Sequence, residues 1–187
     1  MEINEMKIKS CKLRAADEFR AKGDVRHYLN GIHINKDFVQ ATNGHVAIQM
    51  NSEVKTRLDV IVRFKGKIPK SAYTTKLEFS KGKNIAYHYD NMDELISVQI
   101  FSIEEGKFPD LKRVIPDEFK IENAHPTIAA EYMAVTHKAF GNQRARVAMK
   151  VVHCDSNEKA VVYEVKSPSL HECGKPLVVI MPMRDYE

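Results

Sequence analysis

The sequence has no tryptophan and only three cysteines among its 187 residues, and it has no apolar run long enough to cross a membrane. Cys11, Cys154 and Cys173 are widely spaced, odd in number and without a CxxC pair, which argues against a disulfide framework and a zinc ribbon. Residues 1–10 lack the basic stretch followed by an apolar core that marks a signal peptide. We therefore expect a soluble, cytoplasmic protein with no membrane partner.

Motifs of metal and catalytic sites are also missing. His153-Cys154 and His171-Glu172-Cys173 contain ligand side chains, but their spacing matches no common metal-binding pattern. The sequence has no GxSxG, GxGxxG, HExxH or P-loop motif. We expect no metal, no cofactor and no enzymatic activity. A small enzyme whose motifs are not recognised remains an open alternative.

The composition is that of an ordinary globular protein, with 43% hydrophobic and 29% charged residues. The net charge is only +4, from 29 Lys and Arg against 25 Asp and Glu. This mild excess permits contact with a polyanion, and a slightly basic surface explains it equally well.

Apolar runs separated by turn residues recur three times along the chain. Leu13, Ala16 and Phe19 share one side of a predicted helix at residues 11–21. Further helices are predicted at residues 68–76 and 126–140, and the other runs have the length and alternation of strands, among them residues 27–35 and 119–122. The pattern predicts an α+β fold of three strand–helix–strand–strand–strand units, with antiparallel sheets and the helices on one face.

Three segments are more distinctive than the rest. The first contains DVRHYLNG at residues 24–31 and ATNGH at residues 41–45. The second is KFPDLKRVIP at residues 107–116, in which two prolines stiffen a connection. The third is VVIMPMR at residues 178–184, in which Met181 and Met183 either offer adaptable apolar surface or simply fill the core.

At these three places the sequence resembles the bacterial sliding clamp, the beta subunit of the replicative DNA polymerase. The resemblance covers residues 6–116, which match the clamp's middle domain, and the end of the chain, which matches the end of its last domain. It implies a DNA-clamp fold with a clamp-like domain at residues 1–116 and a half-sized unit at residues 117–187. The first domain and the first half of the last one have no counterpart, so the family's head-to-tail dimer is not implied.

The resemblance also implies a groove that binds short linear peptides of polymerases and repair proteins. The corresponding residues here are Thr42, Gly44, His45, Pro109, Val114, Val179, Met181, Pro182, Met183 and Arg184. Val46 stands where the family usually has arginine, which puts one polar contact in doubt. Residues 185–187 could cover part of this groove.

The family lines its central hole with basic helices that touch DNA phosphates without reading bases. The candidates for this role are Lys12, Arg14, Arg20 and Lys22 on the first helix, Lys70 and Lys76 on the second, and Lys138 near the third. A solvated polar face explains the same residues equally well.

Two functional hypotheses follow from the resemblance. In the first, the chain is a miniature clamp that self-assembles around double-stranded DNA and tethers polymerases by their clamp-binding peptides. The family's rings contain twelve units, so four chains of three units would restore that number in a closed homo-oligomer. In the second, the chain is a non-encircling decoy or regulator, of phage or mobile-element type, that competes with a host clamp for its partners.

Overall fold

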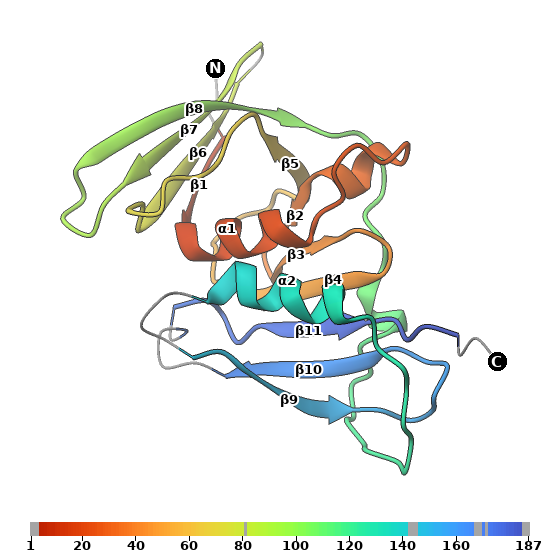
Figure 1. Cartoon of the computed structure of the whole chain (residues 1–187). Helices are drawn as coiled ribbons and strands as arrows, with labels where there is room; N and C mark the ends of the chain where they lie inside the picture. Colours follow the sequence, from red (N-terminus) through yellow and green to blue (C-terminus); the bar gives the residue numbers. More distant parts are fainter. Residues whose placement is uncertain (1–3, 81, 142–145, 167–169, 171, 185–187) are drawn as a thin grey trace.

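The computed structural model describes residues 4–80, 82–141, 146–166, 170 and 172–184. These residues form one antiparallel sheet of 11 strands, in the order β1-β6-β7-β8-β5-β2-β3-β4-β11-β10-β9, with two α-helices side by side on one face (Figure 1). The strands are β1 (Asn4–Lys9), β2 (Ile32–Ile34), β3 (Phe38–Thr42), β4 (Val46–Asn51), β5 (Val60–Phe64), β6 (Thr74–Phe79), β7 (Asn84–Tyr89), β8 (Leu95–Ile103), β9 (Ala148–His153), β10 (Val161–Lys166) and β11 (Leu177–Ile180). The helices are α1 (Ser10–Phe19) and α2 (Ala130–Phe140), with short 3-10 helices at His27–Asn30 and Leu111–Arg113.

The first two units are interlocked. β1 leaves its own unit to pair with β6, where Ile8 lies opposite Thr75. β5 in turn pairs with β2 of the first unit, where Ile32 lies opposite Val62. Each unit therefore completes the sheet of the other, and residues 4–103 form a single body.

The third unit continues the same sheet through β11. This strand pairs antiparallel with β4, where Val179 lies opposite Ala47 and Ile180 opposite Val46. Side chains alternate between the two faces of a strand, so neighbouring residues enter different cores. Val46, Val178 and Ile180 belong to the main core under the helices. Ala47 and Val179 belong to a second apolar cluster on the opposite face, together with Ile61, Phe108, Leu111, Ile115, Ala160 and Val162.

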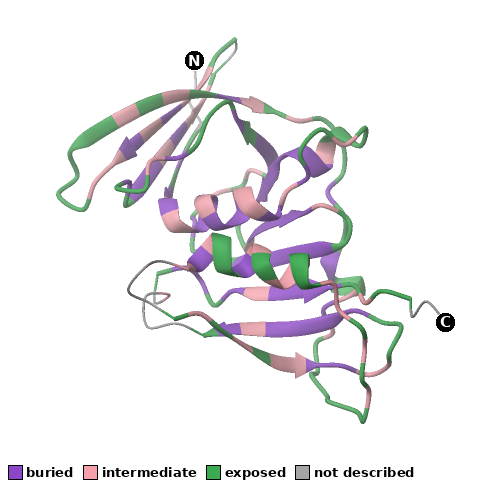
Figure 2. Cartoon of the chain, viewed as in Figure 1, coloured by how far each residue is buried: buried purple, intermediate pink, exposed green. Residues whose placement is uncertain are grey.

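The burial pattern follows this arrangement (Figure 2). The strands in the middle of the sheet are mostly buried, and Leu13, Ala16 and Phe19 of α1 are fully buried against them, as their spacing predicts. Strand β8, between β7 and β5, carries mostly exposed residues. Among the described helices, none is long and apolar enough to span a membrane.

The predicted α+β class, with antiparallel sheet and helices on one face, is confirmed, but the helix predicted at residues 68–76 is wrong. Residues 69–72 form a turn in which the Ala72 N–H donates to the Pro69 carbonyl, at 3.1 Å, and β6 begins at Thr74. The β-branched pair Thr74-Thr75 favours strand, and pairing with β1 on one side and β7 on the other outweighs the helix signal of Pro69.

Two predicted strands also differ. The run at residues 27–35 is interrupted by the 3-10 helix His27–Asn30 and reduces to the strand Ile32–Ile34. The run at residues 119–122 forms only one isolated parallel bridge, between Ile121 and Cys154.

The helix predicted at residues 126–140 is present but begins later, at Ala130.

Candidate functional site

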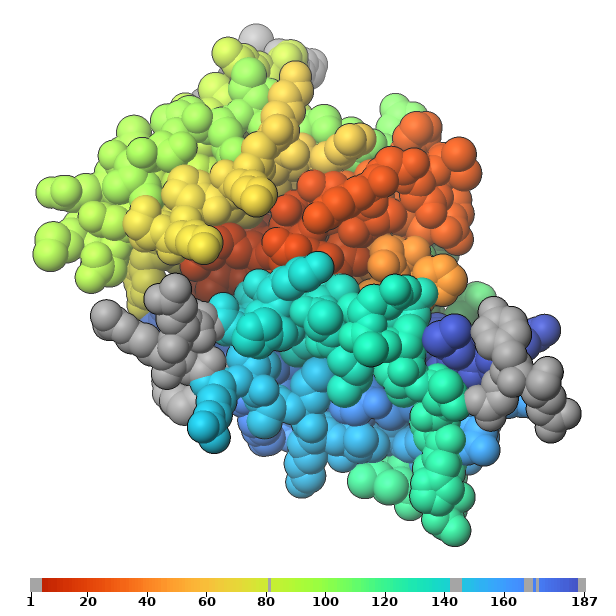
Figure 3. Space-filling model, in the orientation of Figure 1, coloured from red at the N-terminus to blue at the C-terminus, as the bar shows by residue number. Residues whose placement is uncertain are grey.

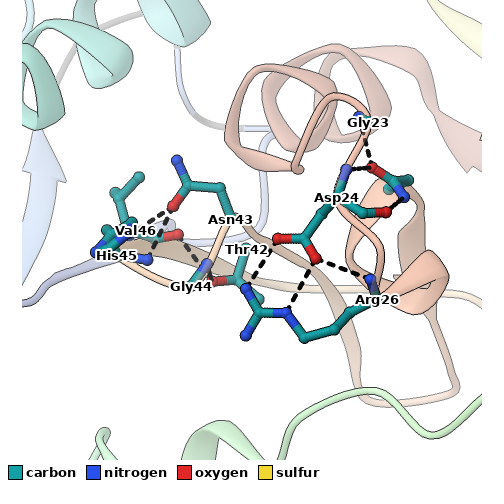
Figure 4. Close-up of polar contacts among 9 residues, drawn as sticks. Gly23, Asp24, Arg26, Thr42, Asn43, Gly44, His45 and Val46 are labelled. Atoms are coloured by element: carbon teal, nitrogen blue, oxygen red, sulfur yellow. Dashed lines mark hydrogen bonds and ion pairs between the residues drawn. The ribbon is translucent and has the colours of Figure 1, made fainter.

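The turn between β3 and β4 is held by its own side chains (Figure 4). Thr42 Oγ1 donates to the Val46 carbonyl at 2.9 Å and accepts from the Gly44 N–H at 3.0 Å. Asn43 Oδ1 accepts from the N–H groups of His45 and Val46, at 2.9 and 3.0 Å. Gly44 has φ +95°, a conformation that favours glycine. This internal bonding presents His45 at the tip of the turn, where it is exposed.

Arg26 lies against this turn. A Cβ atom built on Gly44 would lie 3.4 Å from Arg26 Nη2, so the guanidinium covers the glycine (Figure 4). Arg26 Nη2 and Nε both donate to the Asp24 carboxylate, at 2.8 and 3.0 Å, and these hydrogen bonds lower the pKa of Asp24 to about 2. Arg26 occurs in the DVRHYLNG segment but was not among the predicted site residues. The structure adds Arg26 to the site because its guanidinium approaches Gly44, a contact that the sequence does not show.

The segment after β11 runs along the same turn. The Met181 N–H donates to the His45 carbonyl at 2.9 Å, and the Met183 N–H donates to the Thr127 carbonyl at 2.8 Å. The side chains of Met181 and Met183 are 37% and 40% exposed, so they do not fill the core. Arg184, the last described residue, is also exposed. Residues 185–187, predicted to cover part of the groove, lie outside the described residues.

Helix α2 contributes a residue that the sequence prediction missed. The ring of Tyr132 stacks on that of His45, with centroids 5.6 Å apart and an interplanar angle of 8°. In the sequence, Tyr132 lies at helical spacing from the apolar residues Ile128, Val135 and Ala139, which is typical of a packing residue. Its contact with His45 depends on how the third unit docks on β4.

The structure places most of the predicted residues in one of two groups and leaves Pro109 outside both. The structure brings Thr42, Gly44, His45 and Met181 together at the β3–β4 turn. Pro182, Met183 and Arg184 continue the chain from Met181, and Met183 bonds to Thr127 rather than to the turn. Val114 and Val179 lie in the second apolar cluster, where Val179 is buried. Pro109 is exposed beside the buried Phe108 and belongs to neither group of contacts.

Lys12 was predicted to face DNA, and this prediction is wrong. Its side chain is fully buried, and Nζ donates to the carbonyls of Asn51 and Ser52, at 2.8 and 2.9 Å, and to the Glu53 carboxylate, at 2.6 Å. Residues 12, 16 and 19 follow the i, i+4, i+7 spacing of one helix face, so Lys12 lies on the buried stripe of α1. It ties α1 to the loop that follows β4.

Three further predicted cations are engaged within the chain. Arg14 donates to the carbonyls of Pro69 and Ala72, at 2.9 and 2.7 Å, and Arg20 pairs with Asp17 at 2.6 Å. Lys76 lies on strand β6 rather than on a helix. Its neighbours Thr75 and Leu77 are buried, so Lys76 points to the face opposite the helices, where it pairs with Glu5 and Glu78. The DNA-facing prediction is therefore also wrong for Lys76.

The remaining cations, Lys22, Lys70 and Lys138, are exposed. Lys70 and Lys138 line a cavity of about 1120 Å³ on the helix face, with Arg14 and Lys67 but also with Asp17 and Glu18. In Figure 3, α1, the loop before β6 and α2 adjoin one another on this face. Because acidic side chains share the cavity, its positive charge is partly offset.

Among the described residues, no three His, Cys, Asp or Glu side chains gather as a metal site. His171, part of the HEC segment considered above, lies outside the described residues.

The fold is that of bacterial sliding clamps. The chain matches the DNA polymerase III beta subunit of Borrelia burgdorferi, solved in complex with a natural product, with a TM-score of 0.64 and 16% identity over 97% of this chain and 64% of that one. It matches the DNA polymerase sliding clamp of Pseudomonas aeruginosa with a TM-score of 0.59 and 16% identity, over 97% of this chain and 67% of that one. It matches the DNA polymerase III beta subunit of Thermotoga maritima with a TM-score of 0.57 and 12% identity, over 100% of this chain and 67% of that one.

No protein-family model and no curated protein sequence matches the chain. The chain spans 64 to 67% of the length of these three clamps. At such low identity, the similarity establishes the clamp fold and not the activity or partners of this protein.

Proposed function

We propose that this protein is a non-catalytic, clamp-like protein of DNA replication that binds short peptides at the β3–β4 turn. The observation that carries the proposal is the convergence of three distant segments on His45: its own turn, Tyr132 of α2 and the strand-like backbone at Met181. Residues 1–116 form the clamp-like domain in this proposal, and residues 117–187 form the half-sized unit that completes the site.

The chemistry of the site suits a short peptide with an apolar anchor. Met181 and Met183 present flexible, polarisable side chains that adapt to different apolar residues. Tyr132 and His45 provide a stacked aromatic surface beside them. Arg184, which is exposed next to Met183, offers a guanidinium group that can pair with an acidic residue flanking the anchor.

The test is a titration of the full chain with a fluorescein-labelled clamp-binding peptide of a polymerase, followed by fluorescence anisotropy. We expect saturable binding, weakened at least about tenfold in a Met181→Ser/Met183→Ser variant because the apolar anchor loses its contacts. Met92→Ser is the matched control, because Met92 is 77% exposed and belongs to the turn between β7 and β8. Equal affinity in all three proteins, or no binding, contradicts the proposal.

The self-assembling clamp is the leading form of this proposal. In it, four chains enclose double-stranded DNA with the helix face inward, and Lys22, Lys70, Lys138 and Arg14 contact phosphates. Two features of the sheet support self-assembly: β9 is a terminal strand, and β8 exposes Leu95, Ile96, Val98 and Ile100. Light scattering over a range of concentrations tests the assembly, and a chain that stays monomeric throughout contradicts it.

One observation favours the non-encircling decoy or regulator instead. On α1, Lys12 is buried and Arg20 is paired with Asp17, which reduces the number of free cations that the described residues place on the helix face. Retention on nicked circular DNA, compared with linear DNA, separates the two forms. Retention on the circle alone supports encirclement, whereas no retention together with competition against an intact clamp for peptide supports the decoy.

A further inference from the structure

Two of the three cysteines lie together on the helix side of the molecule. Cys11 is on α1, and Cys173 is in the segment that leads into β11, 162 residues later (173 minus 11). Cys11 Sγ lies 3.6 Å from the carbonyl oxygen of Glu172, the residue before Cys173, and both cysteines line the cavity between α1, the loop before β6 and α2. They therefore bridge the first and third units of the fold.

The surrounding contacts hold this pair in place. Cys11 Sγ donates to the Glu172 carbonyl at 3.6 Å. The Glu172 carboxylate pairs with Lys9 at 3.2 Å and accepts from the Tyr73 hydroxyl. On the other side of Cys173, the Gly174 carbonyl accepts from the Asn51 N–H at 2.6 Å. The residues on both sides of Cys173 are thus held to the first two units, which keeps Cys173 beside Cys11.

The two thiols differ in access. Cys173 is 4% exposed, whereas Cys11 is only partly buried and faces the cavity. The hydrogen bond from Cys173, and then the nearby charges of Arg14 and Lys12, lower the pKa of the Cys11 thiol. The hydrogen bond to Cys11 and burial raise the pKa of Cys173. Cys11 is therefore the thiol that an incoming reagent meets first, and in its more reactive form.

We propose that Cys11 and Cys173 are a redox modification site, at which a reversible disulfide latches α1 to the segment entering β11. The oxidant is a low-molecular-weight disulfide. The Cys11 thiolate attacks one sulfur of this disulfide, forming a mixed disulfide and releasing one small thiol. Cys173, after losing its proton, attacks the Cys11 sulfur and releases the second small thiol. Two protein thiols are thus oxidised while one small disulfide is reduced to two thiols.

The latch acts on the junction that also builds the peptide site. β11 carries the chain to Met181, and its pairing with β4 sets the position of the third unit. A disulfide between α1 and the segment entering β11 restricts the conformations of the unfolded chain, which stabilises the folded state. The stabilisation increases with the length of the closed loop, and this loop spans most of the chain. The inference does not depend on the proposed peptide binding, because its readouts are thiol content and melting temperature.

The test is incubation of the full chain with oxidised glutathione, followed by thiol titration in denaturant and mass spectrometry of tryptic peptides. We expect the accessible thiols to fall from three to one, with the Cys11 and Cys173 peptides linked within one chain. The melting temperature of the oxidised chain rises by about 5 to 10 °C over that of the reduced chain. Dithiothreitol reverses both changes.

Single substitutions assign the roles. Cys173→Ser traps glutathione on Cys11 as a mixed disulfide, whereas Cys11→Ser yields no intramolecular link. Cys154→Ser is the matched control and forms the latch, because Cys154 follows β9, and its thiol donates to the Ser156 carbonyl at 3.9 Å. Retention of all three thiols in the unsubstituted chain, or a link through Cys154, overturns the inference, and this readout is independent of whether any variant folds.

Discussion

Strands β4 and β8 each end a unit of the fold, yet they are covered very differently. β4 pairs with β3 along one edge and with β11 along the other, whereas β8 pairs with β7 along its length and with β5 only at residues 101–103. The buried residues of β4 are Val46, Ala47, Ile48 and Met50. The exposed apolar residues of β8 are Leu95, Ile96, Val98, Ile100 and Ile103. Burial of β4 thus has two sources: α1 and the main core on one face, and the third unit, which supplies the partner strand β11.

The largest expected effect is the loss of stability when a buried residue that covers β4 is shortened, compared with the same kind of change on the exposed strand β8. Ile180→Ala, which empties a fully buried position on β11 opposite Val46, lowers the free energy of unfolding by about 2–5 kcal/mol. Val98→Ala on β8 lowers it by less than about 1 kcal/mol, because Val98 is 51% exposed. Urea unfolding of both variants measures the difference. Equal losses at the two positions would mean that β4 and β8 are covered alike.

A second test concerns His88 on β7, the strand next to β8. His88 is fully buried. Burial, and then the charge of Arg14, lowers its pKa to about 4, whereas its pKa in the unfolded chain is about 6.5. Between these values the unfolded state binds more protons, so stability is complete above pH 6.5 and falls as the pH decreases toward 4. The loss reaches about 3 kcal/mol at the low end.

Unfolding at several pH values measures this loss, with His88→Gln as the reference because glutamine does not titrate. The difference between the two proteins should change with pH only below 6.5. A parallel pH dependence in both would show that His88 is not the responsible group.

The third test concerns Lys12, which joins α1 to the end of β4. Lys12→Met keeps the side chain's length but leaves the Asn51 and Ser52 carbonyls without their donor, which lowers the free energy of unfolding by about 1–3 kcal/mol. Lys22→Met is the matched control, since Lys22 is exposed, and its effect stays within about 0.5 kcal/mol. Thermal unfolding of the pair measures both. If Lys12→Met is neutral, Lys12 is not a structural tie.

The smallest effect is expected at the turn itself. Gly44→Ala forces a side chain onto a backbone with φ +95° and lowers the free energy of unfolding by about 1 kcal/mol. Gly66→Ala is the control, because an added Cβ would make only an ordinary 3.5 Å contact with Gln99 Oε1. Urea unfolding distinguishes them. We also expect Gly44→Ala alone to weaken peptide binding, because the turn displays His45.

The sequence was sufficient for the elements whose local signals agree with their packing. Leu13, Ala16 and Phe19 predicted α1. Asn43-Gly44 lies between two apolar runs, and Asn-Gly is typical of the tight turn that joins β3 and β4 here. The helix predicted at residues 68–76 has Pro69 at its first turn, where proline is tolerated, but strand pairing with β1, which comes from a different unit, overrode it. Local patterns do not contain such a distant pairing.

The candidate site shows the same division. The motifs around Thr42 and Met181 could be found in the sequence, and the structure brings these two segments together. Tyr132 could not be assigned, because its approach to His45 depends on docking of the third unit on β4. Arg26 could not be assigned either, because its approach to Gly44 depends on how the loop before the 3-10 helix folds back within the first unit. The prediction for Lys12 was wrong because a charged side chain was expected to face solvent. Its helical spacing from Ala16 and Phe19 instead places it on the buried face of α1.

The most direct test of the account uses methionine methyl groups as local probes. Protein labelled with ¹³C at the methionine methyls is titrated with a clamp-binding peptide and followed by NMR. The account predicts that the resonances of Met181 and Met183 shift with the peptide, whereas those of exposed Met92 and buried Met50 do not. Shifts confined to Met92, or no shift of Met181 and Met183 at saturating peptide, would contradict the proposal that peptides bind at the β3–β4 turn.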